Sequence, residues 1–146
     1  MISNKNFLEN DDEVASLLRN TKTITVLGIK PESHSMQPAF YVPKYMQDAG
    51  YRIVPVPIYY PDVTDILGEL VYRHLSEIPD PVDMVNVFRR PQDIPQHVDE
   101  IIAAKPNSVW FQLGIVHDEA AEAFARDGIK VVQDRCLLVE HRNLIR

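Results

Sequence analysis

The chain has 146 residues, of which 45% are hydrophobic and 25% are charged, which is typical of one globular domain. Its formal net charge of -6 argues against a general electrostatic grip on nucleic acid, which requires clustered Lys and Arg side chains. No apolar run approaches the ~20 residues of a membrane span, and residues 1–12 lack the apolar core of a secretory signal. We therefore expect a single cytoplasmic domain over residues 1–146, with no nucleic-acid and no membrane partner.

The first half of the chain alternates between helix-like and strand-like segments. An amphipathic stretch at about 7–20 predicts an added N-terminal helix, and the apolar run at 23–28 predicts the first strand. A polar loop then leads to a helix that stops at Gly50, and Pro43 disfavours a regular helix in the residues before it. The second strand is expected at 52–57.

The second half continues the alternation after a segment without a clear period. Residues 59–80 fit either a broken helix or a short extended piece followed by a helical turn. The third strand is expected at 84–88, and apolar spacing with an early proline predicts a helix at 90–104. The remaining expected elements are a strand at 108–114, a helix at 118–128 and a strand at 129–133.

This rhythm of strand and helix predicts a doubly wound, Rossmann-like α/β fold. We expect a five-stranded, mostly parallel sheet in the order 3-2-1-4-5, with helices on both faces. Ligands of such sheets bind beyond the carboxyl ends of the strands. The residues that follow each predicted strand are therefore the candidates for a site.

Two strand ends carry groups that suit a phosphate. Gly28 permits a sharp turn, and Lys30 and Ser35 precede a helix whose backbone amides favour an anion. The turn matches neither a dinucleotide fingerprint nor a Walker loop, so a plain strand-to-helix connection is the alternative. Arg89 and Arg90 directly follow the third strand and can bind phosphate in a bidentate manner. The alternative for this pair is one arginine bound to an acidic neighbour and one solvated.

The sequence carries no clear catalytic or metal-binding pattern. Cys136, the only cysteine, forms no internal disulfide and has no activating neighbours. His34 stands between two serines, an adjacency that seldom provides the facing geometry of a nucleophile and its base. The other histidines lack metal-ligand spacing, although His117 is expected beside the crevice. We therefore expect neither catalytic residues nor a metal site.

Several segments resemble a known family, the small stand-alone coenzyme A (CoA)-binding domain proteins. These are similar to the CoA-binding Rossmann-like domain of the succinyl-CoA synthetase alpha subunit and of acyl-CoA synthetases. The resemblance covers about residues 14–141, and its most specific element is AsnValPheArgArgPro. The segments that carry the resemblance are 28–31, 42–56, 81–95, 109–115 and 131–136.

The resemblance implies a site for the adenosine and phosphate groups of CoA along the carboxyl rim of the sheet. The cofactor-binding residues that it implies are Gly28, Ile29, Lys30, Pro31, Ser35, Tyr41, Val42, Pro55, Val56, Val87, Phe88, Arg89, Arg90, Gln112, Leu113 and Gly114. Among them, the turn at 28–31 would take the phosphates, and the segment 87–90 would flank the adenine and its ribose phosphate. One departure is that Pro57 and Ile58 stand where relatives have an AsnPro pair.

The predicted function is binding of CoA or an acyl-CoA, without catalysis by this chain itself. One alternative is an interaction module or subunit with a vestigial pocket. A small nicotinamide-dependent reductase is disfavoured, since Pro57 and Ile58 occupy the place of its acidic ribose ligand. The sequence leaves open a homodimer or a synthetase-type partner.

Overall fold

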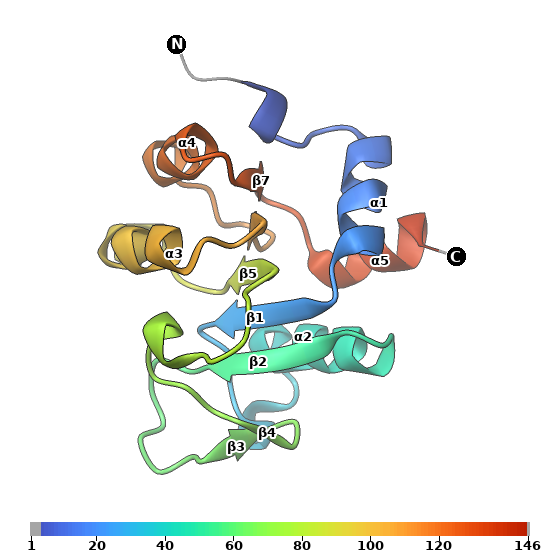
Figure 1. Cartoon of the computed structure of the whole chain (residues 1–146). Coiled ribbons are helices and arrows are strands. Elements are labelled where there is room, and N and C mark those ends of the chain that lie inside the picture. The colour runs from blue at the N-terminus through green and yellow to red at the C-terminus, as the bar shows by residue number, and fades with distance from the viewer. Residues whose placement is uncertain (1–3, 146) are drawn as a thin grey trace.

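The computed structural model describes residues 4–145, and its principal feature is a parallel sheet in the order β2-β1-β5-β6-β7 (Figure 1). Neighbouring strands pair in parallel throughout this sheet. The predicted fold class and the positions of its strands are therefore confirmed. The strands are β1 (Thr23–Leu27), β2 (Arg52–Val56), β5 (Met84–Val87), β6 (Ser108–Phe111) and β7 (Lys130–Val132).

The predicted strand order is wrong in one respect. The order 3-2-1-4-5 would place the second strand between the first and the third, whereas β1 pairs with both β2 and β5. The connection after β2 passes β1 and returns on its other side, so the winding direction reverses between β1 and β5. Such a reversal is the topological switch point, where open α/β sheets bind ligands.

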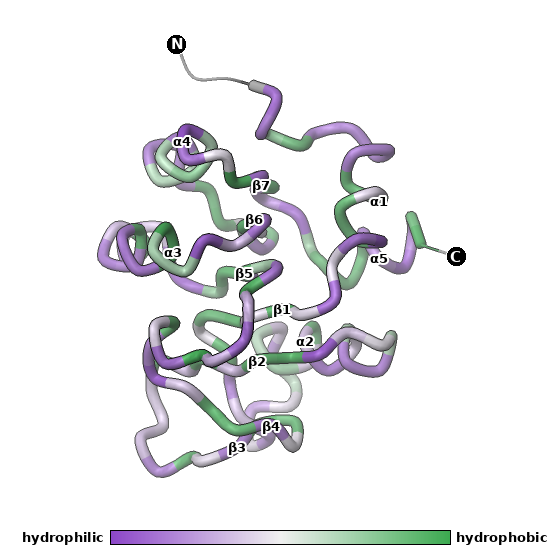
Figure 2. Tube along the Cα trace, in the orientation of Figure 1, coloured by the Kyte–Doolittle hydropathy of each residue, from purple (hydrophilic) through white to green (hydrophobic). Residues whose placement is uncertain are grey.

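Helices cover the sheet on both faces (Figure 1). The helices on one face are α1 (Asp11–Asn20), α2 (Pro38–Asp48) and α5 (Leu137–Leu144), and those on the other are α3 (Val98–Ala104) and α4 (Asp118–Arg126). Each face has its own core, with Val14, Met46 and Trp110 in one and Val85 and Phe124 in the other. Apolar residues accordingly concentrate in the strands and on the inner sides of the helices (Figure 2).

Two predicted helices are shorter than expected. The N-terminal helix begins at Asp11 rather than near residue 7, because the Asn10 side chain caps it by accepting from the Glu13 N–H at 2.9 Å. Residues 90–104 form an α-helix only from Val98. Two 3₁₀ turns, each beginning with a proline, precede it (Pro91–Asp93 and Pro95–His97), since proline has no N–H to continue a helical ladder.

The helix α2 begins at Pro38, earlier than Pro43 suggested. Pro43 has no N–H and cannot donate to the carbonyl of Ala39, four residues earlier. The backbone N–H of Lys30 donates to that carbonyl instead, at 3.1 Å. The helix therefore tolerates Pro43 because a loop residue satisfies the group that Pro43 leaves free.

The segment between β2 and β5 contains a hairpin and no α-helix. Its strands are β3 (Asp65–Ile66) and β4 (Glu69–Leu70), and a 3₁₀ turn follows at Leu75–Glu77. Of the two alternatives for residues 59–80, the extended piece with a helical turn is the closer one. The hairpin lies beside β2 at the sheet edge (Figure 1).

Gly28 allows the ends of β1 and β5 to lie against each other. It has φ +92°, and a Cβ built on it would lie 3.0 Å from the carbonyl carbon of Phe88 and closer still to its oxygen. The Phe88 N–H in turn donates to the Leu27 carbonyl at 2.8 Å. No residue with a side chain fits this position without moving the backbone of Phe88, the residue after β5.

We predict that Gly28→Ala lowers the free energy of unfolding by about 3 kcal/mol or more, because backbone strain and a backbone overlap add. Gly128→Ala is the matched control, since Gly128 also has positive φ (+84°) but has open space around it. Its cost should be about 1–2 kcal/mol. Urea unfolding of both variants measures the difference, and equal losses would show that the overlap is relieved.

Candidate functional site

A cavity of about 320 Å³ lies at the switch point, beyond the carboxyl ends of β1, β2 and β5. It combines cationic side chains with aromatic and aliphatic ones. Three separate segments of the chain build it, one after each of these strands. The residues that line it are Gly28, Ile29, Lys30, Ile58, Tyr59, Tyr60, Phe88, Arg89 and Arg90.

The first wall is the turn after β1. Ile29 is buried and anchors the turn in the core, while the Lys30 side chain is partly exposed and its Nζ donates to Gln37 Oε1. The bond from the Lys30 N–H to Ala39 ties the turn to the first residues of α2. The turn therefore brings a primary amine next to the N-terminus of a helix, a combination that favours anions.

The second wall contains two arginines with different surroundings. The Arg89 side chain is only 10% exposed, and its Nε donates to Nε2 of His97 at 3.1 Å. Since Nε2 accepts, Nδ1 of His97 carries the proton and donates to Glu100 Oε1 at 2.9 Å. The Arg90 side chain is 69% exposed, and its Nε donates to Asp93 at 2.9 Å. Arg90 is therefore free to turn other N–H groups toward a ligand, whereas Arg89 is held.

The third wall follows β2, and the residue-by-residue prediction did not include it. Ile58 and Tyr60 are partly buried, whereas Tyr59 is 64% exposed. The Tyr60 ring packs edge-on against His34, with ring centroids 5.1 Å apart. The resemblance carried no role onto these residues, since the departure from the family pattern was expected at Pro57 and Ile58. Their position directly after a strand was the available signal.

Other predicted site residues lie outside this cavity. Gln112 is 4% exposed, and its Oε1 accepts from the Leu137 N–H at 3.3 Å and from Asn86 Nδ2 at 3.4 Å. Gln112 thus links β6 to β5 and to the start of α5. The buried residues of the set are Pro31, Val42, Pro55, Val56 and Val87, and the more exposed ones are Ser35, Tyr41, Leu113 and Gly114.

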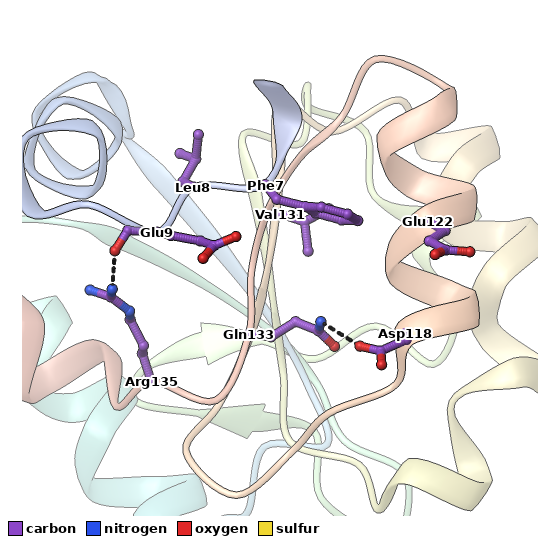
Figure 3. A pocket seen from close by; sticks show the side chains of 8 residues that line it. All are labelled: Phe7, Leu8, Glu9, Asp118, Glu122, Val131, Gln133 and Arg135. Carbon is purple, nitrogen blue, oxygen red and sulfur yellow. Dashed lines mark hydrogen bonds between the residues drawn. The ribbon is translucent and has the colours of Figure 1, made fainter. Parts of the chain in front are cut away.

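A second cavity, of about 510 Å³, lies by α4 and the outer strand β7 (Figure 3). The carboxylates of Glu9, Asp118 and Glu122 line it. Its one arginine, Arg135, is already bound to the Glu9 carbonyl and pairs with Glu140 at 3.1 Å. This acidic surface repels phosphate, so charge distinguishes it from the cavity at the switch point.

Within residues 4–145, no three His, Cys, Asp or Glu side chains gather in a way that would hold a metal ion. No helix in the same range combines the length and apolar character that crossing a membrane requires.

The family model described as CoA binding domain matches residues 22–142. The chain belongs to this CoA binding domain family. The resemblance noted from its sequence segments is thereby confirmed, and the match includes the three walls of the switch-point cavity.

Proteins of Bacillus subtilis and Thermus thermophilus are similar to this CoA binding domain protein over most of its length. YneT of Bacillus subtilis is 36% identical over 131 residues, which cover 88% of this chain and 92% of that protein. The cell-free ID.343 protein from Thermus thermophilus is 40% identical with a TM-score of 0.86, over 94% of this chain and all of that one. A dinucleotide-forming acetyl-coenzyme A synthetase of Ca. Korarchaeum cryptofilum shares the fold alone, with 15% identity, a TM-score of 0.64 and coverage of 80% of this chain and 27% of that one.

The buried position of Gln112 yields a prediction. Gln112→Leu should lower the free energy of unfolding by about 1–3 kcal/mol, because the buried Leu137 N–H loses its acceptor and Asn86 Nδ2 keeps only the Trp110 carbonyl. The dissociation constant for CoA should stay unchanged in the folded variant. Thermal unfolding and calorimetric titration test the two parts, and a large loss of affinity without a loss of stability would assign Gln112 to the ligand.

Proposed function

We propose that this protein binds coenzyme A or an acyl-CoA through its adenosine and phosphate groups at the switch-point cavity. One observation carries the proposal: the ends of β1 and β5 meet there and bring Lys30, Arg90 and Phe88 into one cavity. CoA presents an adenine, a pyrophosphate and a ribose phosphate, which need an apolar slot and cations. Membership of the CoA binding domain family supports the same ligand.

The division of the cavity suits the two ends of the CoA nucleotide. The turn at 28–31 offers the Lys30 amine to the pyrophosphate, near the start of α2. The opposite wall offers the exposed Arg90 to the ribose phosphate and the Phe88 ring to the adenine. Ile58 and Tyr59 extend the apolar surface on the side of β2.

We further propose that the chain binds this ligand without catalysing a reaction on it. Two histidines near the rim, His97 and His117, are engaged in structural bonds. Both ring nitrogens of His97 are occupied, by Arg89 and Glu100. His117 caps α4, with its Nδ1 accepting from the Ala120 N–H at 3.1 Å. These bonds support a binding role over acid–base catalysis.

We predict that wild-type protein binds CoA in a calorimetric titration and that Arg90→Ala weakens CoA by about tenfold or more, the value of a hydrogen bond to a charged group. The affinity of Arg90→Ala for dephospho-CoA, which lacks the ribose phosphate, should fall much less. Lys30→Ala should lower the affinity for both ligands by similar factors, because both contain the pyrophosphate.

Lys44→Ala is the matched control for loss of a cation, since Lys44 pairs with Asp48 on the surface of α2 at 2.8 Å. Its affinity for both ligands should equal that of the wild type. Absence of binding of CoA and acetyl-CoA to the wild type would overturn the proposed function. Equal losses for CoA and dephospho-CoA in Arg90→Ala would overturn the assignment of Arg90 to the ribose phosphate.

A further inference from the structure

Arg73 holds the loop that forms the third wall of the switch-point cavity. Its guanidinium donates to four backbone carbonyls of that loop, all within residues 59–63. Arg73 itself is absent from the lining of the cavity. The acceptors and their distances are Tyr59 at 3.2 Å, Tyr60 at 3.0 Å, Pro61 at 3.4 Å and Val63 at 2.7 Å.

The partners of this guanidinium are unusual for an arginine. Within residues 4–145, no carboxylate lies within ion-pairing distance of Arg73. Its donors are instead used on carbonyls of one loop: Nη1 donates to Tyr59, and the two N–H groups of Nη2 are shared among Tyr60, Pro61 and Val63. The guanidinium thus stabilises the conformation of the loop.

The loop needs such support because its backbone is strained. Tyr60 has φ +67°, a left-handed conformation that is costly for a residue with a side chain. The Tyr60 carbonyl also accepts from the Val63 N–H at 3.1 Å, which closes a tight turn. Strained residues persist where their surroundings hold them, and they gather at functional sites. Tyr60 lines the switch-point cavity, so the strain lies in its wall.

The backbone around Arg73 is itself held in place by hydrogen bonds. The preceding residue, Tyr72, donates its N–H to the Pro55 carbonyl of β2 at 2.9 Å. The backbone N–H groups of Arg73 and His74 donate to Glu77 Oε1 at 2.9 and 3.1 Å. These two bonds lower the pKa of the Glu77 carboxyl, which keeps it ionised as an acceptor. Arg73 is therefore anchored to the sheet before it reaches the loop.

We propose that Arg73 is a positioning residue of the ligand site: by binding four carbonyls it holds Ile58, Tyr59 and Tyr60 against the ligand. This inference rests on the proposed CoA-binding function. Without the guanidinium, the Tyr59, Pro61 and Val63 carbonyls lose this donor and the Tyr60 carbonyl keeps only the Val63 N–H, so the loop exchanges its single conformation for many. The ligand must then order the loop on binding, which reduces affinity.

The test compares Arg73→Ala and Arg73→Lys with Arg126→Ala, an exposed arginine on α4 that serves as the matched control. Arg73→Ala should lower the affinity for CoA by about tenfold or more, as expected when a supporting contact of a site is lost. Its amide hydrogen exchange should rise within residues 58–64 and stay unchanged in the sheet. Millimolar guanidinium ion, but not sodium chloride, should restore part of the affinity by occupying the vacated place among the carbonyls.

Arg73→Lys keeps the charge and the aliphatic stem, so it tests the inference even where Arg73→Ala fails to fold. One ammonium cannot reach four carbonyls, and we expect weakened binding with raised exchange of the loop. Unchanged exchange at 58–64, or full affinity in Arg73→Lys, would overturn the inference. A wild type that binds CoA no better than Arg73→Ala also overturns it, whereas a wild type that binds no CoA species overturns the proposed function together with the role of Arg73 in it.

Discussion

The carbonyl of Phe88 occupies the space where a side chain at residue 28 would begin, and the architecture of the site depends on this close approach. It lets the end of β1 and the end of β5 lie in direct contact, with the Phe88 N–H bonded to Leu27. The chain leaves this point in opposite directions, toward α2 on one side and toward α3 on the other. The groups that follow each strand, Lys30 and Arg90, thereby come to face a common cavity.

Charge is divided along the carboxyl rim of the sheet. The chain as a whole is acidic, with a net charge of -6, yet the cavity at the switch point holds Lys30, Arg89 and Arg90. The acidic cavity (Figure 3) lies beside β7, the strand at the edge of the sheet opposite β2. An anionic ligand is therefore attracted to one part of the rim and repelled from another, while the overall charge opposes the long phosphate backbone of a nucleic acid.

The strands were predictable because parallel strands buried on both faces form continuous apolar runs, as in 84–88 and 108–114. Their order was not, since the path of residues 57–83 depends on tertiary contacts such as the bond from Tyr72 to β2. The same limit applies to the site. Gly28 and Phe88 could be found at strand ends, but the different surroundings of Arg89 and Arg90 arise from His97, whose position depends on two proline-initiated turns.

Pro43 shows how an interruption in one element can serve another. It leaves the Ala39 carbonyl without its helical donor, and the N–H of Lys30 takes that place. The turn after β1 is thus built into the hydrogen-bond ladder of α2. A residue with an N–H at position 43 would offer the Ala39 oxygen a second donor. The bond from Lys30 would then no longer be needed to satisfy that oxygen. Because Pro43 has no N–H, the Ala39 carbonyl stays available to the N–H of Lys30, and the turn stays attached to the helix.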